Sequence, residues 1–528
     1  MRYLVQNIKL PPDQRGEVLQ PLVKGLGIHE KELSYWRIVR EAVDARRGQF
    51  FFVYHIEFEL QPSIRLPKNT KFEVLHATAP EYPVPTPGNQ LLLHPPVVVG
   101  AGPAGYFAAL LLAEQGYRPL LIERGAPIEE RIKDVEAFWK EGKLQSGSNV
   151  QFGEGGAGTF SDGKLTTQIR DPRVFKVLRE FVRCGAPEEV LFKHKPHVGT
   201  DRLRRVVIRL RKRILELGGE IRFHTQLKKL LINQGSIEGI ILEDGNQIAT
   251  ESVILAIGHS ARETFHQLFE QGLEMEAKPF SLGVRIEHLQ EWVDEAQYGR
   301  WAGHPKVDAA EYKLVYHTTS GRTVYTFCMC PGGEVVASTS EEGHVVTNGM
   351  SYFARDGKNA NSALLVGVSP ADFGEKHPLA GLAYQNHWER LAYQAGGGGY
   401  VAPVQRVGDF LTDSKPLEPG KVLPTYTPSV QPYEIRSILP AYVTDSLKEA
   451  LPQLGKSLKG FDHPDSLMTA VESRSSSPVR MIRNPFGESN LMGLFPAGEG
   501  AGYSGGIVSS AVDGLRSAEC LIQKFRMR

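Results

Sequence analysis

The sequence predicts an α/β fold in which a Rossmann-type nucleotide-binding domain is interrupted by a β-rich insertion and preceded by a small α+β domain. Three observations predict it. Three valines at 97–99 lead into the glycine-rich turn GAGPAG at 100–105 and then into an apolar helix. A second glycine-rich segment, PAGEGAGYSGGI, lies at 496–507, near the end of the chain. Between them, region 275–440 is rich in glycine, aromatic and polar residues, with short expected strands, which is typical of an inserted domain.

Composition narrows the class of protein. The 61 lysines and arginines balance 60 aspartates and glutamates, so no overall field attracts nucleic acid or an anionic membrane. We therefore expect a small-molecule substrate and no nucleic-acid or membrane partner, and no oligomeric state is indicated. Segment 95–113 is apolar enough to resemble a membrane span, but its glycines and prolines occupy turn positions.

The start of the chain, MRYLVQNIKL, lacks the apolar stretch of a signal peptide. Four cysteines are too few for a disulfide scaffold, and they lack zinc-ligand spacing, so no metal site is expected. The expected location is the cytoplasm, with an organellar stroma or matrix as the alternative.

Five segments are expected along the chain. Residues 1–77 form the small α+β domain, with strands at 3–8, 34–46 and 49–60 and a helix at 14–26. Residues 78–94 form a stiff, proline-rich linker. The nucleotide-binding domain occupies 95–274, the inserted substrate or cap domain 275–440, and the C-terminal return of the nucleotide-binding domain 441–528.

The turn at 100–105 is the first candidate binding motif. Gly100 permits a tight turn out of the strand, Gly102 lets a pyrophosphate approach the backbone, and Gly105 lets the helix pack closely on the sheet. The helix N-terminus then offers free N–H groups to the phosphates. The whole turn belongs to the predicted site: Gly100, Ala101, Gly102, Pro103, Ala104 and Gly105.

An acidic residue follows the next expected strand, 119–122. Glu123 lies 18 residues beyond Gly105 and suits the hydroxyls of an adenosine ribose. We expect its loss to weaken cofactor binding more than it changes the fold. Arg124 beside it and Leu227, in an expected strand at 227–233, are included among the cofactor contacts.

Two further motifs extend this site. The buried strand 252–257 ends in Ala256-x-Gly258, similar to the Ala-Thr-Gly stretch of glutathione-reductase-like FAD-binding folds. Segment 494–507 resembles the Gly-Asp motif of the same folds, where the acid binds the ribityl chain. Here the matching residues are Gly498 and Glu499, and the helix that begins at Ile507 behind Gly505 and Gly506 would face the flavin. An NAD domain needs only the first motif, whereas an FAD domain of this class needs the C-terminal segment to return.

A glycine-rich loop at 151–165 is the fourth motif. We interpret it as a backbone loop lying against the pyrophosphate or the isoalloxazine, with a flexible surface loop as the alternative. Phe152 and Phe160 favour a packed loop. The predicted contacts from this loop are Gly155, Gly156, Ala157, Gly158 and Ser161.

Two motifs leave alternatives open. Cys328-x-Cys330 is either a redox pair or reactive thiol beside a flavin, or two buried small residues entering a turn. Burial among Phe327 and Met329 would raise the thiol pKa, so we expect serine variants of both cysteines to keep their flavin. Segment 472–480, ESRSSSPVR, is either an anion site or a polar surface loop.

Taken together, these motifs resemble a family. GGAGTFSDGKL at 155–165, FCMCPGG at 327–333, NSALLVGV at 361–368, ESRSSSPVR and PAGEGAGYSGGI are similar to the FAD-dependent proteins called NAD(FAD)-utilising dehydrogenases. The resemblance spans about 95–528. It implies FAD on a glutathione-reductase-like fold with an inserted β-rich domain, and it names no substrate.

The leading hypothesis is an FAD-dependent oxidoreductase or dehydrogenase that transfers hydride through flavin N5. No second GxGxxG occurs in a strand–turn–helix context, so NAD(P)H, if it is the reductant, would reach the flavin through the cap cleft. One alternative is an RNA-modifying flavoenzyme, supported by the basic helix expected at 203–217. The other is a non-catalytic FAD-binding redox sensor. Catalytic residues are not predicted.

Overall fold

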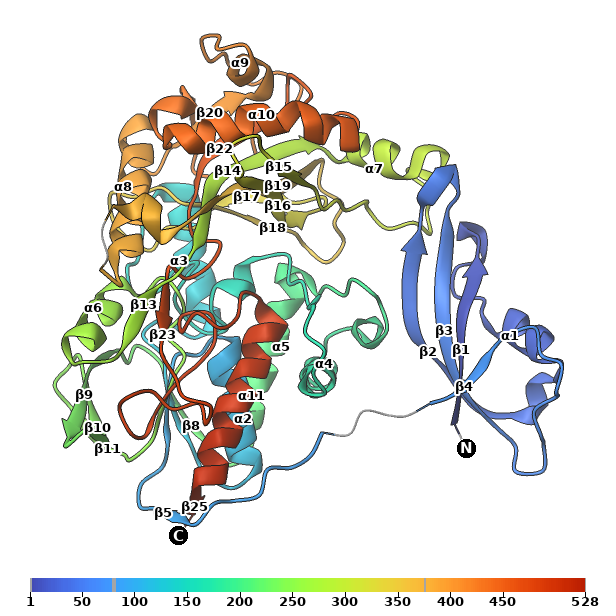
Figure 1. Ribbon diagram of the computed structural model, residues 1–528, viewed down its shortest axis with the longest axis horizontal. Helices are drawn as coiled ribbons and strands as arrows, with labels where there is room; N and C mark the ends of the chain where they lie inside the picture. Colours follow the sequence, from blue (N-terminus) through green and yellow to red (C-terminus); the bar gives the residue numbers. More distant parts are fainter. Residues whose placement is uncertain (1, 78–81, 375–376, 528) are drawn as a thin grey trace.

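The computed structural model describes residues 2–77, 82–374 and 377–527. Residues 78–81 of the expected linker lie outside the described residues. The chain forms a mixed α/β structure, as predicted, with a small N-terminal unit standing beside two larger sheets (Figure 1).

The N-terminal unit is a four-stranded antiparallel sheet in the order β2-β3-β1-β4. Alternating side chains of its strands bury one face against the single α-helix. That helix begins only at Leu19, because Pro12–Gln14 forms a 3₁₀ turn and Gly16 follows in the left-handed region at φ +83°. The elements are β1 (Arg2–Leu10), α1 (Leu19–Leu26), β2 (Leu33–Asp44), β3 (Phe51–Leu60) and β4 (Val74–His76).

The expected nucleotide-binding domain contains a five-stranded parallel sheet in the order β24-β12-β6-β7-β8. Its strands are β6 (Val97–Val99), β7 (Leu120–Ile122), β8 (Glu220–Arg222), β12 (Val253–Leu255) and β24 (Leu494–Pro496). Because all five run in the same direction, the segments that follow them meet at one edge of the sheet. The turn at 100–105 and the segments beginning at Ala256 and Ala497 follow three adjacent strands.

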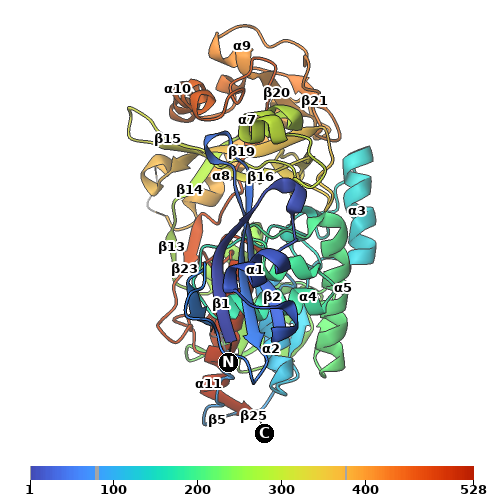
Figure 2. The ribbon, with the colours of Figure 1, turned by 90° about the vertical axis from the view of Figure 1, so that its right-hand side faces the viewer.

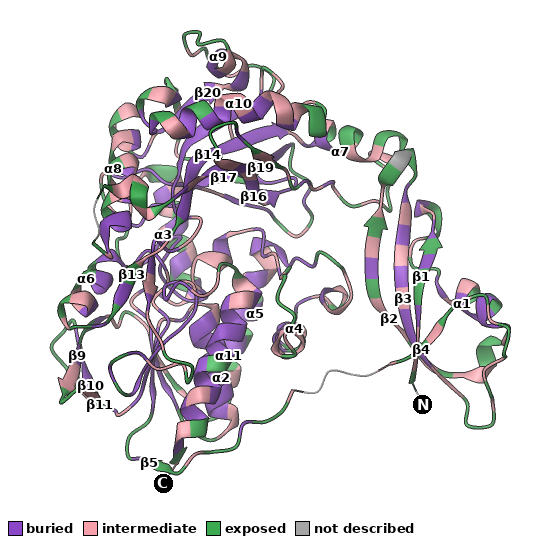
Figure 3. Cartoon of the chain, viewed as in Figure 1, coloured by how far each residue is buried: buried purple, intermediate pink, exposed green. Residues whose placement is uncertain are grey.

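Different layers cover the two faces of this sheet. Val98, Leu121 and Ile254 pack against helices, whereas Val97, Val99 and Leu255 pack against a three-stranded antiparallel sheet. Helix α2 is buried over nearly its whole length because it lies between the sheet and its neighbouring helices (Figure 3). The helical layer contains α2 (Pro103–Glu114), α4 (Arg173–Arg183), α5 (Gly199–Glu216) and α11 (Ile507–Lys524). The other layer contains β9 (Leu227–Asn233), β10 (Ser236–Leu242), β11 (Gln247–Ala249) and α6 (Arg262–Glu270).

The insertion forms a second, seven-stranded sheet in the order β15-β16-β19-β14-β22-β20-β21, set beyond the carboxyl edge of the parallel sheet (Figures 1 and 2). Its strands are β14 (Phe280–Leu289), β15 (Val315–His317), β16 (Thr323–Cys330), β19 (Asn359–Val368), β20 (Ala402–Arg406), β21 (Val430–Pro432) and β22 (Leu467–Glu472). Helix α10 (Ala441–Ser457) packs in the same core. Both α10 and β22 follow residue 440, so we propose that the insertion extends to about residue 475.

The remaining helices and strands connect these units or cover their edges. They are β5 (Gln90–Leu92), α3 (Ile128–Glu141), β13 (Met275–Ala277), α7 (Gln290–Tyr298), β17 (Glu334–Ala337), β18 (Thr347–Met350), α8 (Ala380–Ala395), α9 (Val407–Leu411), β23 (Val479–Met481) and β25 (Phe525–Met527). None of the helices in the described ranges is long and apolar enough to cross a membrane.

We expect a chain that begins at residue 82 to fold and to retain the nucleotide site. Among the residues that the structure describes, the buried cores of both large sheets contain none from the N-terminal unit. The unit contacts the rest through an ion pair of Arg15 with Asp308 and a backbone bridge of Glu41 with residues 192–194. Tyr298, Trp301 and Val307 also pack against its core. Because these contacts lie at the surface of the larger part, removal of the unit should expose these three side chains but lower the Tm by less than about 5 °C.

Thermal unfolding and gel filtration would check this. As a control, a chain that begins at residue 95 also lacks β5, which pairs with β25, and should be clearly less stable. Aggregation of the chain that begins at residue 82 would show that the N-terminal unit is part of one cooperative fold.

Candidate functional site

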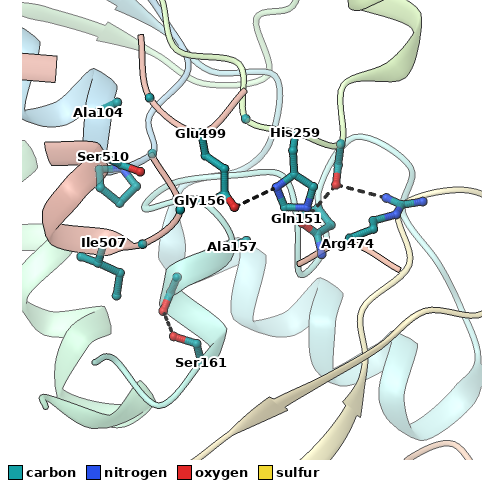
Figure 4. Close-up of a pocket in the computed structure, with 18 of the residues that line it drawn as sticks. Ala104, Gln151, Gly156, Ala157, Ser161, His259, Arg474, Glu499, Ile507 and Ser510 are labelled. Atoms are coloured by element: carbon teal, nitrogen blue, oxygen red, sulfur yellow. Dashed lines mark hydrogen bonds and ion pairs between the residues drawn. The ribbon is translucent and has the colours of Figure 1, made fainter. Parts of the chain in front are cut away.

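A cavity of about 470 Å³ lies where the carboxyl edge of the parallel sheet meets the seven-stranded sheet. The turn after β6, the segments after β12 and β24, and the N-terminus of α11 line one side. Strand β16 and the end of β22 line the other. Figure 4 shows side chains from these distant segments of the chain converging on the cavity.

Most of the predicted site residues line this cavity. They are Gly100, Gly102, Pro103, Ala104, Glu123, Arg124, Gly156, Ala157, Gly158, Ser161, Leu227, Ala256, Gly258, Gly498, Glu499, Gly505, Gly506 and Ile507. Ala101, Gly105 and Gly155 are not among the lining residues. Gly105 instead lets α2 approach the strand, because a Cβ there would overlap the carbonyl oxygen of Gly100.

The three glycines of the turn have different structural roles. A Cβ on Gly100 would overlap the carbonyl oxygen of Ala256, so this glycine is required by the packing of the protein itself. A Cβ on Gly102 would meet only the Cα of Gly156, at 3.9 Å. Gly102 therefore leaves open space in the cavity, at the N-cap position of α2, where an anion would find unpaired backbone N–H groups.

The Glu123 carboxylate accepts more hydrogen bonds from the protein itself than its position in the sequence indicates. Its Oε2 accepts a hydrogen bond from the backbone N–H of Ala101 at 2.8 Å. Its Oε1 accepts from Gly125 at 2.9 Å and from Gly153 at 3.0 Å. Because a carboxylate offers about four acceptor positions, roughly one remains for a ligand hydroxyl. Glu123 therefore joins the turn, its own strand end and the glycine-rich loop.

The glycine-rich loop is held by a fully buried arginine on α3. The Arg131 guanidinium donates to the carbonyl oxygens of Asn149, Val150, Glu154 and Gly156 at 2.6 to 3.0 Å. The Glu154 carboxylate in turn accepts hydrogen bonds from Tyr106, Ile128 and Arg211. The loop is thus packed and fixed, as Phe152 and Phe160 predicted, and the surface-loop alternative is wrong.

The side chains of Glu499 and His259 point toward each other at the cavity wall (Figure 4). The Oε1 of Glu499 lies 3.8 Å from Nδ1 of His259. Within the described ranges, Nε2 of His259 is buried without a hydrogen-bond partner. No pattern in the sequence pointed to His259, which follows Gly258 in the segment after β12. His259 therefore contributes an unpaired hydrogen-bonding nitrogen near the cavity wall.

Of the two arginines in ESRSSSPVR, Arg474 is buried, whereas the side chain of Arg480 is partly exposed. Arg474 donates to both oxygens of Glu389, at 3.0 and 2.8 Å, and to Ser260 at 3.1 Å. Arg262 binds the same carboxylate at 2.9 Å. These two cations hold the pKa of Glu389 well below its usual range despite its burial. The network joins α6, α8 and the segment after β22, and Arg474 also lines the cavity.

The wall formed by the large sheet carries ionisable groups. Cys328 and Glu472 both line the cavity, and Arg285 on β14 lies behind them. The Arg285 guanidinium donates to the carbonyl oxygen of Cys328 at 2.6 Å, to Cys330 Sγ at 3.3 Å and to Glu472 at 3.2 Å. It is completely buried, so its positive charge must be balanced within this cluster.

This environment changes the expectation for the cysteines. A hydrogen bond with the Cys330 thiol, followed by the charges of Arg285 and Lys164, lowers the pKa of Cys328 to about 6. That same hydrogen bond, together with burial, raises the pKa of Cys330. The expectation of an inert thiol thus agrees with Cys330 and not with Cys328. Phe327 is 39% exposed, and the cations come from other strands and loops, which motif spacing does not reveal.

Comparison with known proteins shows which proteins this chain is related to. Residues 279–475 match the family described as FAD-dependent protein, C-terminal domain-like, and residues 3–59 match a domain of unknown function, DUF8436. An uncharacterised protein of Clostridium beijerinckii is 46% identical over 534 residues, covering 99% of each chain. The chain belongs to the same family as this Clostridium protein. The FAD-dependent part of the predicted resemblance is confirmed, while no finding shows the narrower dehydrogenase family.

Similar solved structures are more distant. L-proline dehydrogenase from P. horikoshii is 11% identical, with a TM-score of 0.34 over 82% of this chain and 94% of that one. The flavin-dependent brominase Bmp2 is 11% identical, with a TM-score of 0.36 over 81% and 79%. Scores this low do not support transferring the function of either enzyme.

We expect Glu123→Ala to destabilise the protein even without a ligand, because it leaves three buried backbone N–H groups unpaired. At about 1–3 kcal/mol for each unpaired group, the free energy of unfolding should fall by at least about 2 kcal/mol. This revises the expectation that binding would suffer more than the fold. Urea unfolding of the flavin-free protein measures the change.

Glu123→Gln is the matched control. It keeps one acceptor oxygen for Gly125 and Gly153 and loses only the acceptor for Ala101, so it should be less destabilised than Glu123→Ala. Equal stability of Glu123→Ala and the wild type would show that these hydrogen bonds contribute nothing to folding.

Proposed function

We propose that this protein binds FAD in the cavity, in a glutathione-reductase-like arrangement, and acts as an FAD-dependent oxidoreductase. One observation carries the proposal. The glycine turns after β6, β12 and β24 and the N-termini of α2 and α11 meet at a single cavity, although they come from segments far apart in the chain. The match of residues 279–475 to FAD-dependent proteins supports it independently.

The space at Gly102 fits a pyrophosphate. The N-terminus of α2 offers backbone N–H groups and the positive end of its dipole. Gly156 approaches Gly102 closely, so the fixed loop held by Arg131 covers the same position from the other side. Side chains are absent from both glycines where the phosphates would lie.

Glu123 is proposed to bind the adenosine ribose through the acceptor position that its three amide partners leave free. Its neighbour Arg124 is fixed by Glu263, at 2.8 Å, and lies 4.3 Å from the centre of the Phe152 ring. A planar, cationic wall of this kind suits an adenine base.

Glu499 and the N-terminus of α11 are proposed to hold the ribityl chain and the flavin ring. Gly505 and Gly506 leave the start of α11 free of side chains, so its positive dipole end would stabilise negative charge on a reduced flavin. When bound, FAD would supply hydride transfer through its N5 atom. The substrate would lie between the flavin and the large sheet, where Lys164, Tyr312, Cys328 and Glu472 line the wall.

The RNA-modifying alternative rested on the basic helix α5, and four of the six basic residues at 203–217 contact other groups of the protein. Arg211 and Arg213 of the basic helix α5 bind carboxylates of Glu129, Glu154, Glu114 and Glu180. Arg209 donates to a backbone carbonyl, and Arg204 lies over the Phe160 ring. These four arginines contact groups of the protein itself, whereas Arg205 and Lys212 on the same helix are exposed.

We expect Gly102→Val to abolish FAD retention while leaving the flavin-free fold stable, because its side chain would enter the ligand space and meet little protein. The flavin absorbance per chain after purification, and the Tm of the flavin-free form, measure the two effects separately. The wild type should carry about one FAD per chain.

Gly100→Ala is the control for this position. Its Cβ would overlap a backbone oxygen, and Gly100 has a φ of +103°, so this variant should lose stability as well as flavin. A wild-type protein that is colourless and cannot be reconstituted with FAD would refute the proposal. A Gly102→Val variant that keeps its FAD would refute the assigned phosphate position.

Reduction of the bound flavin by a metabolite distinguishes an oxidoreductase from the redox-sensor alternative. Under anaerobic conditions, we expect at least one fraction of a cell metabolite extract to bleach the bound flavin, with NADH and NADPH tested individually as reductants. FAD that stays oxidised with every fraction, and yet is reduced by dithionite, would favour a sensor over an oxidoreductase.

A further inference from the structure

The side of the cavity that faces the seven-stranded sheet contains three lysines from distant segments of the chain. Lys164 lies in the glycine-rich loop, Lys195 between α4 and α5, and Lys313 between α7 and β15. All three line the cavity. Their spacing in the sequence does not connect them, because each belongs to a different connection between helices and strands.

Among the described residues, two of these ammonium groups have no carboxylate partner. The Nζ of Lys195 lies 3.3 Å from a carboxylate oxygen of Glu311. Lys164 donates a hydrogen bond to the carbonyl oxygen of Met329, which carries no charge. Within residues 2–77, 82–374 and 377–527, the side chain of Lys313 makes neither an ion pair nor a hydrogen bond.

We propose that Lys164 and Lys313 bind an anionic group of the substrate, either a carboxylate or a phosphate. The inference rests on the proposed function, which puts the substrate between the flavin and this side of the cavity. An ammonium group offers three N–H donors, and Met329 uses only one of those on Lys164. Both lysines therefore keep donors for the oxygens of an anion.

Each carboxylate on the same side of the cavity is already bound by a cation. Asp162 is held by Arg355 through both of its oxygens, and Arg355 also binds Glu311 at 2.7 Å. Glu472 is bound by Arg285 at 3.2 Å. Behind them, Arg262 and Arg474 are balanced by Glu341 and Glu389.

Charge balance therefore leaves this side of the cavity positive. The three carboxylates Asp162, Glu311 and Glu472 are offset by the two arginines that bind them and by Lys195, so the charges of Lys164 and Lys313 remain. Ionisation of Cys328 would remove only one of these two positive charges. A cavity wall with an excess of one sign of charge attracts a ligand of the opposite sign.

The ionisation of the two glutamates agrees with this count. Burial would raise the pKa of Glu311, but Lys164, Arg355 and Lys195 together lower it to about 2, so Glu311 is ionised and already counted as negative. Burial raises the pKa of Glu472 to about 7 despite the nearby Arg285. Protonation of Glu472 near neutral pH would make this side of the cavity still more positive.

The connection that carries Lys313 is held in place by ion pairs on both sides of the wall. Glu311, two residues before Lys313, is fixed by Arg355 from within. Asp308 is bound from outside by Arg15 of the N-terminal unit, at 2.9 Å. The backbone that presents Lys313 is therefore positioned before a ligand arrives, which lowers the entropic cost of binding.

Isothermal titration calorimetry of the purified full-length protein tests the site with malonate and with inorganic phosphate as probes. At an ionic strength held constant with chloride, at least one of the two anions should bind saturably, and the diamine putrescine should not. Saturation by malonate alone assigns a carboxylate substrate, and saturation by phosphate alone a phosphorylated one. Binding of neither anion would overturn the proposal.

Lys164→Met and Lys313→Met locate the binding. Each should raise the Kd of the anion by at least about fivefold, because one charge-assisted hydrogen bond is lost, while the FAD content stays unchanged. Lys313 is exposed, so its replacement should not disturb the fold. Unchanged affinity in Lys313→Met would refute the assignment even if Lys164→Met fails to fold.

Lys306→Met is the matched control. It removes the same charge from the same connection, but its ammonium group lies beside Asp13 and Glu17 of the N-terminal unit and does not line the cavity. Its Kd for the anion should equal that of the wild type. An equal loss of affinity in Lys306→Met and Lys313→Met would show a general charge effect and overturn the proposed site.

These outcomes are separable from those of the proposed function. A yellow protein in which neither lysine affects anion binding would refute the anion site and leave FAD binding intact. A colourless protein that cannot take up FAD, but loses anion affinity in Lys313→Met, would refute the proposed function and keep the anion site.

Discussion

The candidate site depends on the buried Arg131 guanidinium. It binds carbonyl oxygens along the loop 149–156, which has too many glycines to hold a shape through its own side chains. With its carbonyls turned toward Arg131, the loop can present N–H groups elsewhere, and those of Gly153 and Gly155 bind Glu123 and Ala101. One side chain on α3 therefore sets the distance between this loop and the turn after β6.

A buried charged group also fixes the junction between the parallel sheet and the seven-stranded sheet. Glu389, which is fully buried, binds Arg262 from the parallel-sheet side and Arg474 from the segment after β22. Breaking one such pair would leave an uncompensated charge in the interior, which costs far more than an exposed ion pair contributes. The relative position of the sheets, and with it the width of the cavity, is thus fixed by charged groups that must stay together.

Much of the nucleotide-binding half could be predicted because its signals are local. The apolar run at 97–99, the helix that follows and the glycines between them occur within about twenty residues, and each constrains its own backbone. The boundary at residue 440 was harder to place. Strand β22 pairs with β14, nearly two hundred residues earlier, and no local pattern reveals that partner. Likewise β11 was not expected, because a three-residue strand has too little periodicity to detect.

By itself, the sequence determined the strand–turn–helix at 97–114, the packed glycine-rich loop and the convergence of most predicted residues on one site. These follow from backbone freedom at glycine and from apolar periodicity, which are properties of neighbouring residues. Only the tertiary structure decided that Glu123 binds three amides, that Arg474 is buried, and that Arg285 lies behind Cys328 and Glu472. Their hydrogen bonds and ionisation depend on groups from distant strands, because strand order in a sheet does not follow chain order.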